Sequence, residues 1–114
     1  MSIRQLLHPV FVLLCGGILF GANAFATDAE NAAVHRGKAL HVDKCAACHA
    51  GKSGLGDGDV LYTRSDRLVK NSKQLDAMVA RCNSEIRLDL FPEDEADLAQ
   101  FLNKNFYKFK QAQK

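Results

Sequence analysis

The stretch HVDKCAACHAGKSGLG, residues 41–56, holds two cysteines that are separated by two residues and followed directly by a histidine. Thiols and imidazoles act as ligands and nucleophiles, so Cys45, Cys48 and His49 at this spacing indicate a dedicated chemical site. Only one other cysteine, Cys82, lies in the part of the chain that we expect to fold. The spacing and the number of partners decide which kind of site this is.

Three kinds of site use such a pair, and two of them fit poorly. Structural zinc takes four nitrogen or sulfur ligands, usually from two separated pairs, and Cys82 is the only later cysteine. A thioredoxin-like dithiol lies between a strand and a helix, and no run of β-branched residues flanks the motif. Covalent haem attachment fits, because two thiols at this spacing reach both porphyrin vinyl groups. We expect Cys45 and Cys48 to form the thioethers of one haem c and His49 to bind its iron.

The N-terminal 26 residues have the pattern of a secretory signal peptide. An apolar run from Val10 to Phe20 follows Arg4, and the small residues of Ala24-Phe25-Ala26 form a cleavage site. The apolar run is shorter than the roughly 20 residues of a spanning helix. We expect a signal peptide over residues 1–26, cleavage after Ala26, a periplasmic location, and no membrane span in the mature domain of residues 27–114.

Charge and size narrow the class of protein further. The formal charge of the 114-residue chain is only +2, which is too small to indicate binding to nucleic acid or to an acidic membrane. The mature part is so short that a bound group is a common means of completing its core. Its cysteines, Cys45, Cys48 and Cys82, are odd in number, which argues against a disulfide framework. We expect one monomeric domain with a prosthetic group in its core.

Hydrophobic spacing predicts three main helices. Residues 32–44 form the first and lead into the cysteine motif. The second begins near Ser72, a suitable N-cap, and carries one apolar stripe: Leu75, Met78, Val79 and Cys82. The third begins at Pro92, where three acidic residues follow in the first turn, and it buries Leu98, Phe101 and Leu102. The glycine-rich residues 50–60 predict a flexible, turn-rich connection.

With this motif and these helices, the mature chain resembles the small mono-haem class I cytochromes c. The resemblance implies an all-α, cytochrome c-like fold of three main helices around one covalent haem, in which the first and last helices cross. In that family a glycine and an aromatic residue, eight and four positions before the first haem cysteine, pack on the last helix. Gly37 and His41 occupy these positions, facing Leu98 and Phe101. The histidine departs from the family pattern and indicates a packed, hydrogen-bonded core residue.

Residues 81–102, RCNSEIRLDLFPEDEADLAQFL, also resemble part of the c-double-prime and SHP-like cytochromes. In those proteins the residue before a Cys-Asn pair is the distal iron ligand, and a second cysteine follows. Here Arg81 occupies the ligand position, where a guanidinium that stays protonated cannot bind iron. Leu90 occupies the second cysteine position. No proline lies between His49 and Pro92, so the usual support of the histidine ring is missing.

The identity of the sixth iron ligand decides between two functions. Met78 is the only methionine in the mature chain and a thioether suits an electron carrier, although a stripe methionine usually just fills the core. Cys82, four residues later on the same face, is the alternative ligand. With the sixth position filled we expect a non-enzymatic carrier of single electrons. With an open position the chain would bind a small gas, such as oxygen or nitric oxide.

A row of basic residues precedes the second predicted helix. Its members lie three positions apart and are Arg64, Arg67, Lys70 and Lys73. Charge runs are usually only a solvated face. If these residues border an exposed haem edge, they would steer an acidic redox partner into a transient complex. We therefore expect a redox partner protein to dock on this row.

Overall fold

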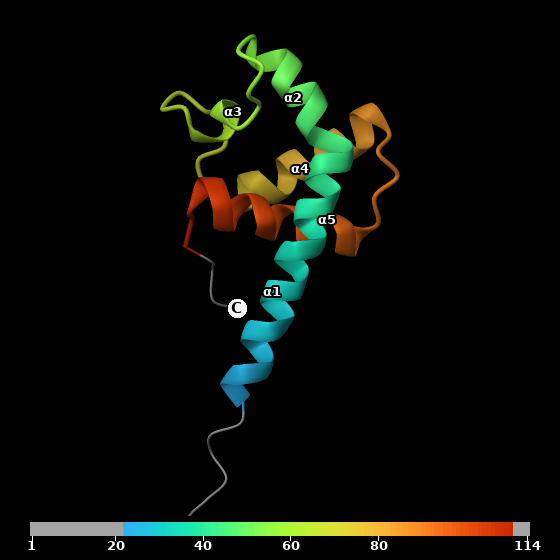
Figure 1. Ribbon diagram of the computed structural model, residues 1–114, viewed down its shortest axis with the longest axis vertical. Coiled ribbons are helices and arrows are strands. Elements are labelled where there is room, and N and C mark those ends of the chain that lie inside the picture. Colours follow the sequence, from blue (N-terminus) through green and yellow to red (C-terminus); the bar gives the residue numbers. More distant parts are fainter. Residues whose placement is uncertain (1–21, 111–114) are drawn as a thin grey trace, which may run out of the picture.

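The computed structural model describes residues 22–110, and side chains from residue 26 (Figure 1). Its elements are α1 (Ala22–Leu40), the π-helical turn η1 (His41–Cys45), α2 (Ala46–Ser53), α3 (Val60–Thr63), α4 (Ser72–Ile86), α5 (Pro92–Leu102) and the π-helical turn η2 (Asn103–Tyr107). The described residues contain no strand, so the predicted all-α class is confirmed. Most of the predicted signal peptide lies outside the described residues, and its cleavage stays a prediction.

The cysteine motif lies within one long helical rod. Figure 1 shows α1, η1 and α2 running end to end, so the first helix extends past both predicted ends. The rod ends where Gly54 adopts a left-handed conformation (φ 71°) and donates its backbone N–H to the Gly51 carbonyl. Glycine takes that conformation without a steric penalty. Residues 50–53 are therefore helical, and only residues 54–59 form the predicted turn-rich connection.

Helices α1 and α5 cross in direct backbone contact (Figure 1). A Cβ atom at Gly37 would lie 2.1 Å from the Asp97 carbonyl oxygen and 2.8 Å from the Cβ of Phe101. Beside this contact, Arg36 Nε donates to the buried Asp97 carboxylate at 2.5 Å. The crossing of the first and last helices, with glycine at the contact, is thus present as the resemblance implied.

The starts of α4 and α5 follow helix-capping rules. Asn71, in an extended conformation, caps α4 by accepting a hydrogen bond from the Gln74 backbone N–H at 2.9 Å. The helix begins at Ser72 as predicted, but Asn71 and not Ser72 is its cap. Pro92 is the first residue of α5, and the Asp94 carboxylate accepts from the Phe91 N–H at 3.1 Å.

Asn83 ties the end of α4 to the start of α5. Its amide nitrogen donates to the Leu90 carbonyl (2.9 Å) and to the Glu95 carboxylate (2.7 Å), and its oxygen accepts from the Leu90 N–H (3.1 Å). Both polar atoms of this side chain therefore form hydrogen bonds with Leu90, and the nitrogen also bonds to Glu95 in the first turn of α5. Asn83 and Leu90, which the narrower resemblance singled out, thus link the end of α4 to the residues that precede α5.

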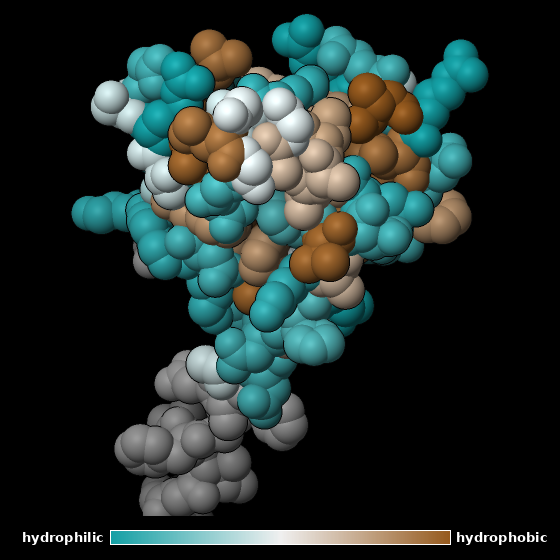
Figure 2. All heavy atoms as spheres, turned by 45° about the horizontal axis from the view of Figure 1, so that its top comes forward, coloured by the Kyte–Doolittle hydropathy of each residue, from teal (hydrophilic) through white to brown (hydrophobic). Residues whose placement is uncertain are grey.

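The core is a single apolar cluster between α4, α5 and η2. Its buried members are Tyr62, Val69, Leu75, Val79, Leu98, Ala99, Phe101, Leu102 and Tyr107. Figure 2 shows a mainly hydrophilic face with separate apolar side chains on it. Within the described residues no helix combines the length and the hydropathy needed to cross a membrane.

Candidate functional site

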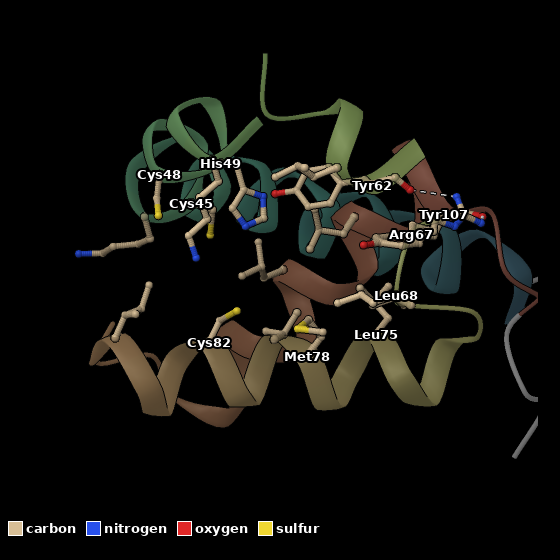
Figure 3. Close-up of a pocket in the computed structure, with 18 of the residues that line it drawn as sticks. Cys45, Cys48, His49, Tyr62, Arg67, Leu68, Leu75, Met78, Cys82 and Tyr107 are labelled. Carbon is tan, nitrogen blue, oxygen red and sulfur yellow. Dashed lines mark hydrogen bonds between the residues drawn. The ribbon is translucent and has the colours of Figure 1, made fainter. Parts of the chain in front are cut away.

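A cavity of about 510 Å³ lies between the motif and α4 (Figure 3). This volume is in the range of roughly 300–1,000 Å³ that is common for small-molecule and cofactor sites. One wall contains Cys45, Cys48 and His49, and the facing wall on α4 contains Leu75, Met78 and Cys82. All five residues that the sequence singled out as haem or iron ligands therefore line one cavity.

The two motif cysteines differ in their surroundings. Cys48 is exposed, whereas Cys45 is half-buried, and burial raises the pKa of the Cys45 thiol to about 11. The neighbouring thiols of Cys82 and Cys48 raise it further, since their charged forms would repel a thiolate. Cys45, Cys48 and Cys82 are all free thiols in the structure. Both motif thiols are thus available for covalent attachment, with Cys48 the more accessible.

The His49 imidazole is held by packing and not by a hydrogen bond. Its Nδ1 is buried without a partner among the described residues, which leaves Nε2 as the nitrogen available to the cavity. Burial lowers the pKa of His49, and positive charge on His41 or Lys52 would lower it too. The ring is therefore neutral at neutral pH, which is the form of imidazole that binds metals. Its nearest aromatic neighbour is Tyr62, at 4.9 Å between ring centroids.

The facing wall presents two sulfur atoms from α4. Figure 3 shows Met78 and Cys82 on the side of α4 that faces the motif, one turn apart. Both side chains are partly buried, and Met78 also packs against the apolar core. Burial raises the pKa of the Cys82 thiol, partly offset by Lys52, so the neutral thiol is favoured over the thiolate. The choice between Met78 and Cys82 as ligand stays a prediction.

Arg67 is a fixed cation in the cavity lining. It donates from Nη1 to the Tyr62 carbonyl at 2.9 Å and from Nη2 to the Tyr107 carbonyl at 3.4 Å. Its guanidinium also lies 5.0 Å from the ring centroid of Tyr107 and 5.3 Å from that of Phe109. No carboxylate among the described side chains pairs with it. An anionic group bound in the cavity would stabilise a half-buried cation of this kind further.

The other residues of the predicted basic row lie in different environments. Arg64 also lines the cavity, but its Nε and Nη2 bind the Asp66 carboxylate. Lys70 Nζ donates to the Ser65 carbonyl at 3.3 Å, and Lys73 is exposed. The row thus differs from a surface of four free charges. Docking of a redox partner here stays a prediction.

Two further residues lie at the site although no pattern in the sequence pointed to them. Tyr62, on the single turn α3, is only 4% exposed and lines the cavity beside His49. Gly58 lies against the motif, since a Cβ there would come within 2.6 Å of the His49 Cβ and 2.8 Å of the Ala50 nitrogen. Their roles depend on contacts between distant parts of the chain, so only the structure reveals them.

Two further sequence expectations concern residues outside the cavity lining. Arg81, at the ligand position of the narrower resemblance, is exposed, and its Nε donates to the Glu85 carboxylate at 2.7 Å. His41 is buried, and its Nε2 shares a hydrogen bond of 3.0 Å with the Tyr62 hydroxyl. His41 is therefore the packed, hydrogen-bonded residue that we expected.

The donor set limits which chemistry the site can support. Within residues 26–110 no group of three or more histidine, cysteine, aspartate or glutamate side chains is arranged to hold a bare metal ion. The cavity instead offers two thiols and a neutral imidazole on one side and sulfur on the other. Comparisons of the chain with protein-family models, curated proteins and solved structures gave no match.

Proposed function

We propose that this chain is an exported mono-haem c-type cytochrome that carries single electrons between redox partners. The observation that carries the proposal is the facing arrangement in the cavity, with Cys45, Cys48 and His49 opposite Met78 and Cys82. In this arrangement Cys45 and Cys48 would attach a haem, His49 would bind its iron, and Met78 or Cys82 could fill the remaining iron position. A haem, when bound, would supply the one-electron change between ferrous and ferric iron.

The motif residues would hold the haem and one axial position. Each thiol would add its S–H across one vinyl double bond of the haem, which would form a carbon–sulfur bond, place the hydrogen on the other carbon and consume no oxidant. Cys45 and Cys48 are the residues for this step. His49 offers Nε2, since its Nδ1 is buried. The lowered pKa keeps this imidazole in the neutral form that ligation needs.

The facing wall would supply the sixth ligand and exclude water. Met78 is the first candidate, because a thioether ligand needs no deprotonation, whereas the raised pKa of Cys82 disfavours the thiolate that binds iron. Leu75, Leu98 and Leu102 line the same cavity and are buried. Arg67 would face a carboxylate of the bound group, such as a haem propionate.

The decisive experiment is an intact mass measurement of the exported protein, from a host with a working haem-ligation system. We expect one haem per chain and loss of the signal peptide. Cys45→Ser and Cys48→Ser should each reduce attachment, whereas Cys82→Ser should leave it unchanged. A mass equal to the bare polypeptide would contradict the proposal. Carbon monoxide added to the reduced protein then separates an electron carrier, which does not bind it readily, from a gas-binding protein, which does.

A further inference from the structure

The cavity wall beside His49 contains a set of side-chain contacts that no pattern in the sequence predicted. Histidines that bind metals usually donate their second ring N–H to an acceptor, which fixes the orientation of the ring. Here Nδ1 of His49 is buried and has no acceptor within the described residues. The orientation of this ring must therefore come from its packing contacts.

Tyr62 provides the main ring contact. Its ring centroid lies 4.9 Å from that of His49, with the planes tilted by 46°. Tyr62 itself is enclosed by further rings, since the centroids of Phe106 and Tyr107 lie 5.0 Å and 5.9 Å away. A buried ring with neighbours on several sides has little freedom to tilt. Tyr62 is thus a fixed surface against which the His49 imidazole rests.

A single hydrogen bond fixes Tyr62 to the helix crossing. Its hydroxyl and His41 Nε2 are 3.0 Å apart, and both residues are buried. Burial raises the pKa of Tyr62 and lowers that of His41, so a neutral hydroxyl meets a neutral imidazole. The His41 ring in turn packs on Phe101 of α5 at 5.3 Å. The position of Tyr62 therefore follows from the α1–α5 crossing.

Gly58 makes a second contact with His49, at the Cβ of its side chain. A Cβ at this position would lie 2.6 Å from the His49 Cβ, so the backbone of the 54–59 turn lies directly against the base of the side chain. Since α3 begins two residues after Gly58, the same short segment brings Tyr62 to the ring. Gly58 confines the His49 Cβ while Tyr62 confines its ring.

We propose that Tyr62 is the positioning residue for the His49 imidazole, and that its hydrogen bond to His41 sets the plane of that imidazole. The proposal rests on the function proposed above, in which His49 binds the haem iron. This role explains why a histidine stands at position 41. It also explains how the His49 ring can be oriented although its Nδ1 has no acceptor among the described residues. Packing against Tyr62, which its hydrogen bond to His41 holds in place, takes the role of a hydrogen bond to the His49 ring.

The test uses the exported, haem-loaded protein and proton NMR of its ferric form. The hyperfine shifts of the haem methyl groups depend on the plane of the axial imidazole, so they report its orientation directly. We expect Tyr62→Leu to change the order or the spread of these shifts and to broaden them. Tyr62→Phe and His41→Phe keep an aromatic ring but lose the hydrogen bond, and each should produce the same kind of change in smaller measure.

Asn103→Ala is the control, since it removes two hydrogen bonds to Phe109 at a buried site outside the cavity lining. It should lower thermal stability and leave the methyl shifts unchanged. Wild-type shifts in all three Tyr62 and His41 variants would overturn the positioning role. If Tyr62→Leu does not fold, the two phenylalanine variants decide the question. Absence of covalent haem in the wild type would instead overturn the proposed function.

Discussion

The carbonyl oxygen of Asp97 occupies the space that a side chain at Gly37 would need. A Cβ there would be 2.1 Å away, far inside van der Waals contact, and the obstacle is backbone that cannot rotate aside. Helices α1 and α5 can approach this closely only with glycine at the contact. The crossing orients both His41 and Phe101.

Gly37→Ala should therefore separate the two helices. Overpacking of a tight core usually costs about 1–3 kcal/mol, and a clash with backbone should lie at or above the upper end. Denaturant unfolding followed by circular dichroism measures the loss. Gly51→Ala is a matched control, because it is also a helical glycine but has no heavy atom within 4 Å of the added Cβ. An equal effect of the two changes would show that the close approach is not important for stability.

Cys45, Cys48 and Cys82 should react with iodoacetamide at different rates in the haem-free protein. We expect Cys48 to react first, because it is exposed, and Cys45 last, because it is half-buried and burial raises its pKa to about 11. Peptide mass mapping over time at constant pH measures the order. In denaturant the difference should vanish. Equal rates without denaturant would mean that the haem-free chain does not form the cavity.

Acidification should destabilise the protein in part through His41. Burial lowers its pKa, so the unfolded chain binds this proton more readily than the folded protein. The contribution to stability is complete above the pKa of a free histidine, about 6.5, and is lost as the pH falls towards the lower folded pKa. We expect the free energy of unfolding to decrease over this window. In His41→Phe the decrease should be smaller, and an unchanged decrease would exclude His41 as its source.

Met78→Ala and Cys82→Ser separate the two candidate iron ligands. If Met78 binds the iron, its loss should open the sixth position, so that the reduced protein changes from ignoring carbon monoxide to binding it. Cys82→Ser should then leave the absorption spectrum unchanged. The reverse pattern would assign the ligand to Cys82. A wild type that already binds carbon monoxide would favour the gas-binding alternative.

Arg67→Gln should lower the reduction potential of the haem-loaded protein. The guanidinium is a fixed positive charge in the cavity lining without a carboxylate partner among the described residues, and its removal favours the ferric state. Arg67→Lys keeps the charge and should retain most of the potential. Lys73→Gln, at an exposed position outside the cavity lining, serves as the control. Redox titration measures all three, and a shift as large in the control would contradict a specific role of Arg67.

Local patterns predicted the parts of the fold that local forces determine. The start of α5 followed from Pro92 and its acidic first turn, and the start of α4 was placed correctly although its cap is Asn71. At both starts the deciding interaction acts within one turn. The crossing at Gly37 was implied instead by the resemblance to the class I cytochromes c, since its contact with Asp97 joins distant parts of the chain.

Tertiary contacts decided the rest. The spacing of three between Arg64, Arg67 and Lys70 describes a common face only in a helix, and residues 64–71 are irregular. Arg67 therefore turns inward onto Tyr107 while Arg64 pairs with its neighbour Asp66. Tyr62 gains its place beside His49 from contacts with residues 21 and 45 positions away, and these leave no periodicity in the sequence.

Among the described residues, helix α5 contacts both α1, which leads into the motif wall of the cavity, and α4, which forms the facing wall. The distance between the two walls therefore depends on α5 and on the hydrogen bonds of Asn83 just before it. A bond from iron to sulfur is sensitive to small changes in length, and a longer one is weaker. If Met78 or Cys82 binds a haem iron as proposed, substitutions on α5 that touch neither the haem nor its ligands would change the reduction potential. They would then offer an engineering route to a family of carriers with graded potentials and one unchanged ligand set.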